Sequence, residues 1–189
     1  MQDDDLSAAV KAAAGGDEEG FAVLWRSLHP PMLRYLRVLV GAAAEDVASE
    51  TWLQVARDLR RFDGDGSAFR GWLFRIARNR AVDDRRRAGR RPEDTTGTVE
   101  GDTPPVRDAA AEALERSGTD WALRLIATLP QDQAEAVMLR VVAGLDVATT
   151  ARVLGKRPGA VRVAAMRGLR RLAADPQVRR LGEISPGEV

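Results

Sequence analysis

The sequence predicts an all-α protein made of two small helical domains joined by a flexible acidic linker. Alanine, arginine, leucine and valine are abundant while aromatic residues form only 5% of the chain, a bias that favours helices over sheets. Apolar residues recur at helical spacing on both sides of residues 93–118, a stretch of proline, glycine, threonine and acids that cannot bury a core. The predicted division is therefore 1–92, the linker 93–118, 119–175, and a tail at 176–189.

Before the linker, the pattern predicts three or four helices. The first covers residues 18–28, and Pro30 and Pro31 are expected to break or kink it. A helical stripe resumes over 32–41, and a further helix spans about 44–60. The inner side of that further helix is predicted to carry Val47, Ala48, Trp52, Val55 and Leu59.

A strongly basic helix follows the polar loop 61–66, which two glycines and two aspartates favour as a turn. Ser67 is the predicted N-cap, and residues 69–91 carry nine arginines against two aspartates, a net charge of +7. The predicted core stripe is Phe69, Trp72, Leu73, Ile76 and Ala77. Because one sign dominates and guanidinium groups match phosphate geometry, the helix indicates a polyanionic partner. The alternative is a solvated face with no ligand.

After the linker, which itself allows a short helix near 108–116, helices are predicted at 121–129 and 131–142. Asp146 then caps a brief helix 147–154, a glycine turn follows, and Pro158 opens a second helix. Inward positions are Val161, Ala164 or Ala165, Leu169 and Leu172, with arginines outward. A short helix, a turn and a basic helix predict a helix-turn-helix that enters a major groove. An ordinary helical hairpin is the alternative.

The net charge of +1 conceals an uneven distribution. Residues 152–180 carry a net charge of +8, whereas residues 1–20 and 93–120 carry −5 and −6. Two basic segments separated by an acidic connector suggest two surfaces that grip one polyanion.

Several classes of function are disfavoured. The chain has no cysteine, which excludes disulfides, thiolate metal sites and cysteine catalysis. The single histidine, His29, has no partner constellation and is interpreted as structural. We find no catalytic constellation and no phosphate-binding glycine motif, so we expect no enzyme activity, metal, cofactor or small-molecule substrate. No run is long enough to span a bilayer, and acids follow Met1, so a cytoplasmic protein that is not membrane-embedded is expected.

Three stretches, residues 44–62, 66–87 and 129–172, carry a resemblance to a known family. With the WL-x-x-IARN string at 72–79, they resemble bacterial sigma factors of the extracytoplasmic-function (ECF) class, which contain only sigma regions 2 and 4. The resemblance implies a protein that binds core RNA polymerase, through the β′ clamp and the β flap, and directs initiation at promoter DNA. Region 2 would recognise and melt the −10 element, region 4 would recognise the −35 element, and an anti-sigma factor would be a further partner.

Carried onto this sequence, the resemblance implies three groups of site residues. The polymerase-binding residues are Asp46, Glu50, Gln54, Arg57 and Asp58. The −10 residues are Arg61, Phe62, Asp63, Ser67, Phe69, Arg70, Trp72, Arg75, Asn79, Arg80, Arg85 and Arg86, of which Arg80, Arg85 and Arg86 are expected on phosphates. The −35 residues are Arg157, Pro158, Gly159, Ala160, Arg162, Val163 and Arg167. Phe69 and Trp72 also fit the core stripe, so either can be a core residue instead.

The sequence departs from the family pattern in the helix-turn-helix, where Val163-Ala164-Ala165 and DVATTARVLG replace commoner strings. The −35 sequence therefore cannot be carried over. Asp94, Glu100 and Asp102 of the linker are candidates to imitate nucleic acid, although a plain tether explains the same composition. The rival functions are a stand-alone helix-turn-helix regulator, which would need a sensor or dimer interface and would bind duplex DNA without polymerase, and a nucleic-acid enzyme.

Overall fold

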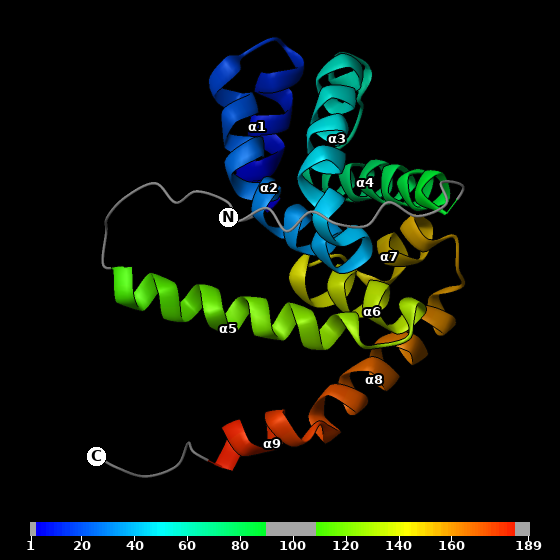
Figure 1. The fold of residues 1–189 in the computed structure, drawn as a ribbon. Coiled ribbons are helices and arrows are strands. Elements are labelled where there is room, and N and C mark those ends of the chain that lie inside the picture. The colour runs from blue at the N-terminus through cyan, green and yellow to red at the C-terminus, as the bar shows by residue number, and fades with distance from the viewer. Residues whose placement is uncertain (1–2, 90–108, 184–189) are drawn as a thin grey trace.

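A computed structural model describes residues 3–89 and 109–183, and all regular secondary structure within these ranges is helical (Figure 1). The acids at 94, 100 and 102 lie outside the described residues. The helices before the gap are α1 (Asp3–Ala14), α2 (Glu18–Val40), α3 (Ala44–Asp58) and α4 (Gly66–Ala88), with single turns at Gly41–Ala43 and Leu59–Arg61. Those after it are α5 (Ala109–Ala127), α6 (Gln131–Val137), α7 (Val147–Leu154), α8 (Pro158–Ala174) and α9 (Pro176–Glu183).

The hairpin of α1 and α2 begins with a helix that the sequence analysis missed. Leu6, Ala9, Val10 and Ala13 follow the i, i+3, i+4, i+7 rule and are buried, so apolar spacing was the available signal. Gly20 of α2 allows the two helices to approach each other closely, because a Cβ at this position would lie 2.8 Å from the Cβ of Ala12 in α1.

Of the two outcomes expected at Pro30 and Pro31, a break or a kink, the break does not occur. One helix runs from Glu18 to Val40 with Pro30 and Pro31 inside it. Neither proline can donate a helical hydrogen bond, but the apolar stripe continues on both sides of them. Its members Leu24, Leu28, Met32, Tyr35 and Leu36 are buried. Burial of this stripe against other helices therefore outweighs the cost of the helical hydrogen bonds that the two prolines cannot make.

The only histidine packs inside the α2–α3 contact. Trp52 Nε1 donates to His29 Nδ1 at 3.2 Å, and the Trp25 ring stacks on the imidazole with centroids 4.6 Å apart. Burial, which outweighs the raising effect of Glu45, lowers the pKa of His29. These contacts support the structural interpretation. Within the described ranges, no group of three or more histidine, aspartate or glutamate side chains is placed to hold a metal ion.

α4 packs on α1, α2 and α3, and its Phe69, Leu73 and Phe74 are fully buried. The predicted stripe is confirmed except that Trp72 remains half-exposed, and Phe74 is also fully buried, with its ring at 5.6 Å from Tyr35. The N-cap is Asp65, whose carboxylate accepts from Ala68 N at 2.7 Å. The prediction of Ser67 as the cap is wrong because the helix begins at Gly66, two residues before the start that a cap at Ser67 predicts.

In residues 109–183, two helix boundaries and one buried position differ from the prediction. The two short helices expected near 108–116 and 121–129 are one helix, α5. The helix expected at 131–142 ends as α6 at Val137 and continues as a π-helical turn, Met138–Val142. In α8 the inward position is Gly168 rather than Leu169, which is 46% exposed, because α6 approaches too closely for a side chain: a Cβ at Gly168 would lie 2.8 Å from Val137 Cγ2.

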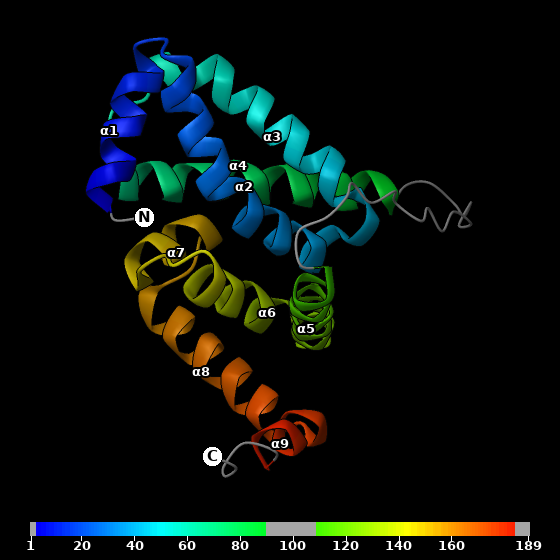
Figure 2. The same ribbon diagram turned by 90° about the vertical axis from the view of Figure 1, so that its left-hand side faces the viewer.

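The two halves lie against each other. α2 packs on α5, α6 and the π-helical turn, and α4 packs on α7 (Figures 1 and 2). One cluster of buried apolar side chains extends through both halves. α8 packs on α6 and α7, and α9 follows it on the side farthest from α1 in both views. None of the described helices is both long and apolar enough to cross a membrane.

Candidate polymerase and nucleic-acid interfaces

The polar face of α3 carries the predicted polymerase-binding residues in one row. Asp46 and Arg57 are exposed, whereas Glu50, Gln54 and Asp58 are half-buried. Leu53 lies among them with 57% of its surface exposed, and the sequence analysis missed it. An apolar residue on a charged helix face was the signal that could have identified it.

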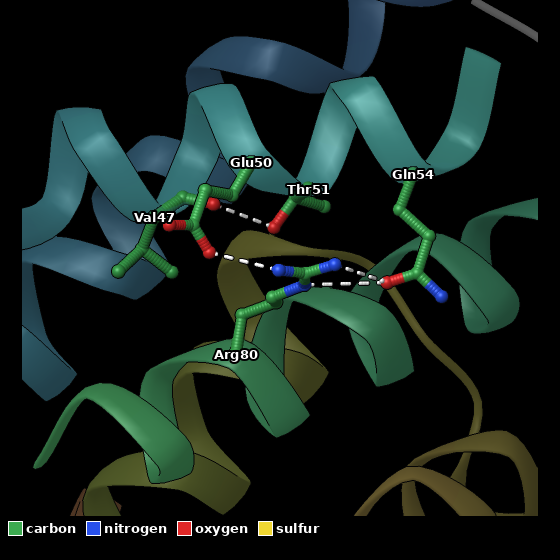
Figure 3. A network of polar contacts seen from close by, with 5 residues as sticks. All are labelled: Val47, Glu50, Thr51, Gln54 and Arg80. Carbon is green, nitrogen blue, oxygen red and sulfur yellow. Dashed lines mark hydrogen bonds and ion pairs between the residues drawn. The ribbon is translucent and has the colours of Figure 1, made fainter. Parts of the chain in front are cut away.

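Arg80 is held by the α3 face (Figure 3). Its Nη1 donates to Glu50 Oε2 at 2.8 Å, and its Nη2 and Nε donate to Gln54 Oε1 at 3.1 and 3.3 Å. These bonds use three of the five N–H groups of the guanidinium. In this conformation the side chain joins α4 to α3, and its expected role at a phosphate stays a prediction.

Three aromatic rings meet where the loop after α3 joins α4. The Phe62 ring stacks on Trp72 with centroids 5.0 Å apart, and it meets Phe69 edge-on at 5.5 Å. Phe62 and Trp72 are half-buried, but Phe69 has no exposed surface. Phe69 is therefore a core residue rather than a base contact in this conformation. The two remaining rings offer a stacking surface for an unpaired base.

The other −10 candidates divide by exposure. Arg61, Asp63, Arg75, Asn79, Arg85 and Arg86 are exposed. Ser67 and Arg70 are half-buried, and Arg70 Nη1 lies 3.5 Å from the position that a Cβ on Gly144 would take, so it faces the second half of the protein. The exposed arginines of α4 form a surface that can hold phosphates.

The predicted helix-turn-helix is present, with its cap, turn and second helix at the expected residues. Asp146 caps α7 and accepts from Thr149 N at 2.8 Å, Gly155 adopts φ 63°, and Pro158 begins α8. Val161 and Ala164 are buried, whereas the −35 candidates Arg157, Pro158, Gly159, Ala160, Arg162, Val163 and Arg167 are all exposed. A free basic face at the start of a second helix is the geometry that enters a major groove.

Comparison with known proteins decides the family. The model of sigma-70 region 2 matches residues 24–91, and that of sigma-70 region 4 matches 119–172. The ECF RNA polymerase sigma factor ShbA of Streptomyces griseus is 38% identical over 189 aligned residues, which cover 92% of this chain and 98% of the relative. The chain belongs to the ECF sigma factors of the sigma-70 family.

Other relatives agree with this assignment. The ECF sigma factor SigD of Mycobacterium tuberculosis is 35% identical over 183 aligned residues, covering 91% of this sigma factor and 84% of the relative. The structure of CnrH in complex with the cytosolic domain of CnrY shares the fold with a TM-score of 0.62 at 23% identity, covering 92% and 96% of the two chains. Sigma factors are non-catalytic subunits of RNA polymerase, and this one directs transcription initiation.

The Asp146 cap yields a stability prediction for this sigma factor. Hydrogen bonds from the backbone and hydroxyl of Thr149 lower the pKa of Asp146 below its ordinary value of 3.8, despite slight burial. Because the pKa is depressed, the cap stabilises the fold above that value and is lost as the pH falls through the folded-state pKa. Asp146→Ala is expected to lower the free energy of unfolding by about 1 kcal/mol. Urea unfolding should give the same loss at pH 7 and pH 5.

The matched control is Asp146→Asn, which keeps a capping oxygen without the charge and is expected to recover most of the loss. An alanine variant as stable as the native protein would contradict the assignment of Asp146 as the cap.

Proposed function

We propose that this sigma factor contacts core RNA polymerase through the row on α3 and contacts the promoter at two places. The β′ clamp binds Asp46, Glu50, Gln54, Arg57 and Asp58, with Leu53 as the apolar centre of the patch, and the β flap binds within residues 119–175. Residues 1–92 form the region 2 domain, 93–118 the linker, 119–175 the region 4 domain and 176–189 the tail. The assembly operates in the cytoplasm, where polymerase and DNA are found.

One observation supports this proposal above the others: each of the two matched sigma regions has a surface of exposed arginines, one on α4 and one on α8. Trp72 of α4 and Phe62, which lies just before this helix, stack an everted base of the melted −10 element, while exposed arginines of α4 hold its phosphates. On α8, Arg157 and Arg162 have the geometry to take guanine edges bidentately, and Val163 to meet a thymine methyl, in the −35 duplex.

An anti-sigma factor is proposed as the third partner. One structural neighbour, the sigma factor RpoE, was solved with the anti-sigma factor NepR from Bartonella quintana and has a TM-score of 0.61 at 21% identity. Another, CnrH, was solved with the cytosolic domain of CnrY. Exposed apolar side chains on both halves, such as Leu53 and Met166, provide surface for a protein that covers the two domains.

The role of Arg80 tests the polymerase-binding surface. Arg80→Ala releases Glu50 and Gln54 from their fixed positions, so the affinity for core polymerase is expected to fall by about two- to fivefold, the effect of a half-exposed ion pair. The measurement is a titration of fluorescently labelled protein with core polymerase. Arg34→Ala, at an exposed position of α2, is the matched control and should leave the affinity unchanged.

The same variant distinguishes the two roles considered for this arginine. Normal affinity for core, together with weaker promoter binding by the holoenzyme and a shallower salt dependence, would instead identify Arg80 as a phosphate contact.

A further inference from the structure

A small hollow lies between α4 and α7, which pack on each other (Figures 1 and 2). One side of the hollow is lined by Phe62, Trp72 and Arg75, and the other side by Thr149 and Arg152. Its volume is about 180 Å³, whereas the pockets of drug-sized ligands hold about 300–1,000 Å³. The hollow therefore has room for one ring system of a ligand rather than for a large cofactor.

The α7 wall of the hollow is held close to α4 by local structure. A Cβ on Gly71 would lie 2.5 Å from Thr149 Cγ2, so the two helices approach this closely because residue 71 has no side chain. The backbone N–H and the hydroxyl of Thr149 both donate to Asp146, at 2.8 and 2.7 Å. These bonds fix the position of Thr149 at the wall of the hollow.

The aromatic side of the hollow suits a flat, unsaturated ring. The Phe62 ring stacks on Trp72 with centroids 5.0 Å apart, and both side chains are half-buried. Partly exposed aromatic rings stack on nucleobases of every kind, because each base has a π face. Val153 adds an apolar surface on the α7 side. A nucleobase that enters the hollow therefore meets apolar contacts from both helices.

Two arginines from different helices give the hollow a positive charge. Arg75 belongs to α4 and Arg152 to α7, both side chains are exposed, and the described residues that line the hollow include no carboxylate. Arg152 Nη2 donates to Thr149 Oγ1 at 2.8 Å, which holds the guanidinium at the α7 wall. Guanidinium groups bind phosphate through charge-assisted hydrogen bonds. A ligand that carries a phosphate beside a base is therefore complementary to the hollow.

We propose that this hollow binds a free nucleoside monophosphate, with the base stacked on Trp72 and the phosphate held by Arg75 and Arg152. The volume admits a single base, and two guanidinium groups match a terminal phosphate, whose charge approaches −2 at pH 7. The inference goes beyond the proposed function, because it adds a small-molecule ligand to the surface where Phe62 and Trp72 are proposed to stack a promoter base. A bound nucleotide and an everted base exclude each other there.

Isothermal titration calorimetry of the free protein with adenosine monophosphate (AMP) measures the site directly. We expect saturable binding of one AMP per chain. Adenosine and inorganic phosphate each keep only part of the ligand, so each should bind about tenfold more weakly or less. Because stacking tolerates any base, GMP and UMP should bind within about tenfold of AMP. An absence of saturable AMP binding, or inorganic phosphate that binds as tightly as AMP, would overturn the proposal.

Arginine variants test the phosphate contacts. Arg152→Ala and Arg75→Ala should each weaken AMP binding by about tenfold, the effect of losing a hydrogen bond to a charged group, and Arg152→Lys should recover part of the loss. Arg34→Ala removes the same charge from an exposed position on α2, outside the hollow, and should leave the affinity unchanged. Circular dichroism checks that each variant is folded. Equal losses in the Arg34 and Arg152 variants would mean that only general charge attraction acts, and the site would be refuted.

Tryptophan fluorescence tests where the base lies. A base stacked on Trp72 should quench part of the emission of the native protein. Trp72→Phe keeps a ring for stacking, so this variant should still bind AMP in the calorimeter while the quench disappears. A quench of full size in Trp72→Phe would place the base at another of the four tryptophans and contradict the proposed site.

An oligonucleotide distinguishes a free nucleotide from one within a strand. A pentamer of deoxyadenosine without a terminal phosphate carries only singly charged phosphodiesters, so it should bind the free protein more weakly than AMP. If the pentamer binds and AMP does not, the hollow is a strand contact and the proposal fails. None of these measurements uses polymerase or a promoter. A negative result therefore leaves the proposed sigma function standing, and a failure of promoter-specific transcription leaves the nucleotide site standing.

Discussion

Replacing Phe69 with alanine is expected to lower the free energy of unfolding by about 3–5 kcal/mol, since the ring is fully buried and its removal leaves a large cavity. The Phe69 ring meets Phe62 edge-on, with centroids 5.5 Å apart, and meets Trp72 at a tilt, with centroids 5.7 Å apart. Loss of the Phe69 ring therefore also loosens the packing of the other two rings. Urea denaturation followed by circular dichroism measures the effect. Phe69→Leu, which keeps most of the apolar volume, should recover a large part of it.

Phe62→Ala is the matched comparison, because Phe62 belongs to the same cluster but is half-exposed. It is expected to cost less stability than Phe69→Ala and to weaken binding of the holoenzyme to single-stranded −10 DNA by about 5- to 150-fold, corresponding to 1–3 kcal/mol for one stacked base. If instead Phe62→Ala unfolds the protein and leaves strand binding intact, the base-stacking role of the exposed rings is wrong.

The second large effect is expected at Arg162, on the exposed face of α8. If its guanidinium takes a guanine edge, Arg162→Ala should weaken binding of the holoenzyme to a −35 duplex by about 1–3 kcal/mol, or roughly 5- to 150-fold, and relax sequence preference at one base pair. Competition binding against a set of single-base variants of a promoter that the sigma factor uses measures both quantities.

Arg171→Ala is the control for that experiment, since Arg171 is exposed on the last turn of the same helix, away from the reading end. If Arg171→Ala weakens binding at all, it should weaken binding to every −35 sequence equally. The only other expected change is in how the affinity depends on salt. Equal and sequence-independent losses in both variants would show that Arg162 contacts phosphate rather than a base.

The helix-turn-helix and the apolar stripes of α3 and α4 could be predicted from the sequence because local signals define them. Asp146, Gly155 and Pro158 each set a boundary through their own backbone chemistry, and apolar spacing identifies the buried side of a helix. The seven −35 candidates were chosen from the family resemblance, and all of them are exposed.

The parts that were not predicted depend on tertiary packing. The two prolines are kept inside α2 by a stripe buried against other helices, and the side chain of Arg80 is directed by Glu50 and Gln54, 30 and 26 residues away in sequence. The contact of Gly71 with Thr149 joins residues on either side of the linker, where no periodic signal reaches. Spacing alone likewise cannot separate Phe69, which is buried, from Trp72, which is half-exposed on the same stripe.

The most direct test of the central claim is transcription in vitro with the purified protein, core RNA polymerase and genomic DNA fragments, followed by mapping of transcript 5′ ends. The account predicts discrete starts that require this protein and share upstream elements near −35 and −10. Failure to bind core polymerase, or specific binding to duplex DNA in its absence with no such starts, would contradict the assignment of α3, α4 and α8 to polymerase and promoter.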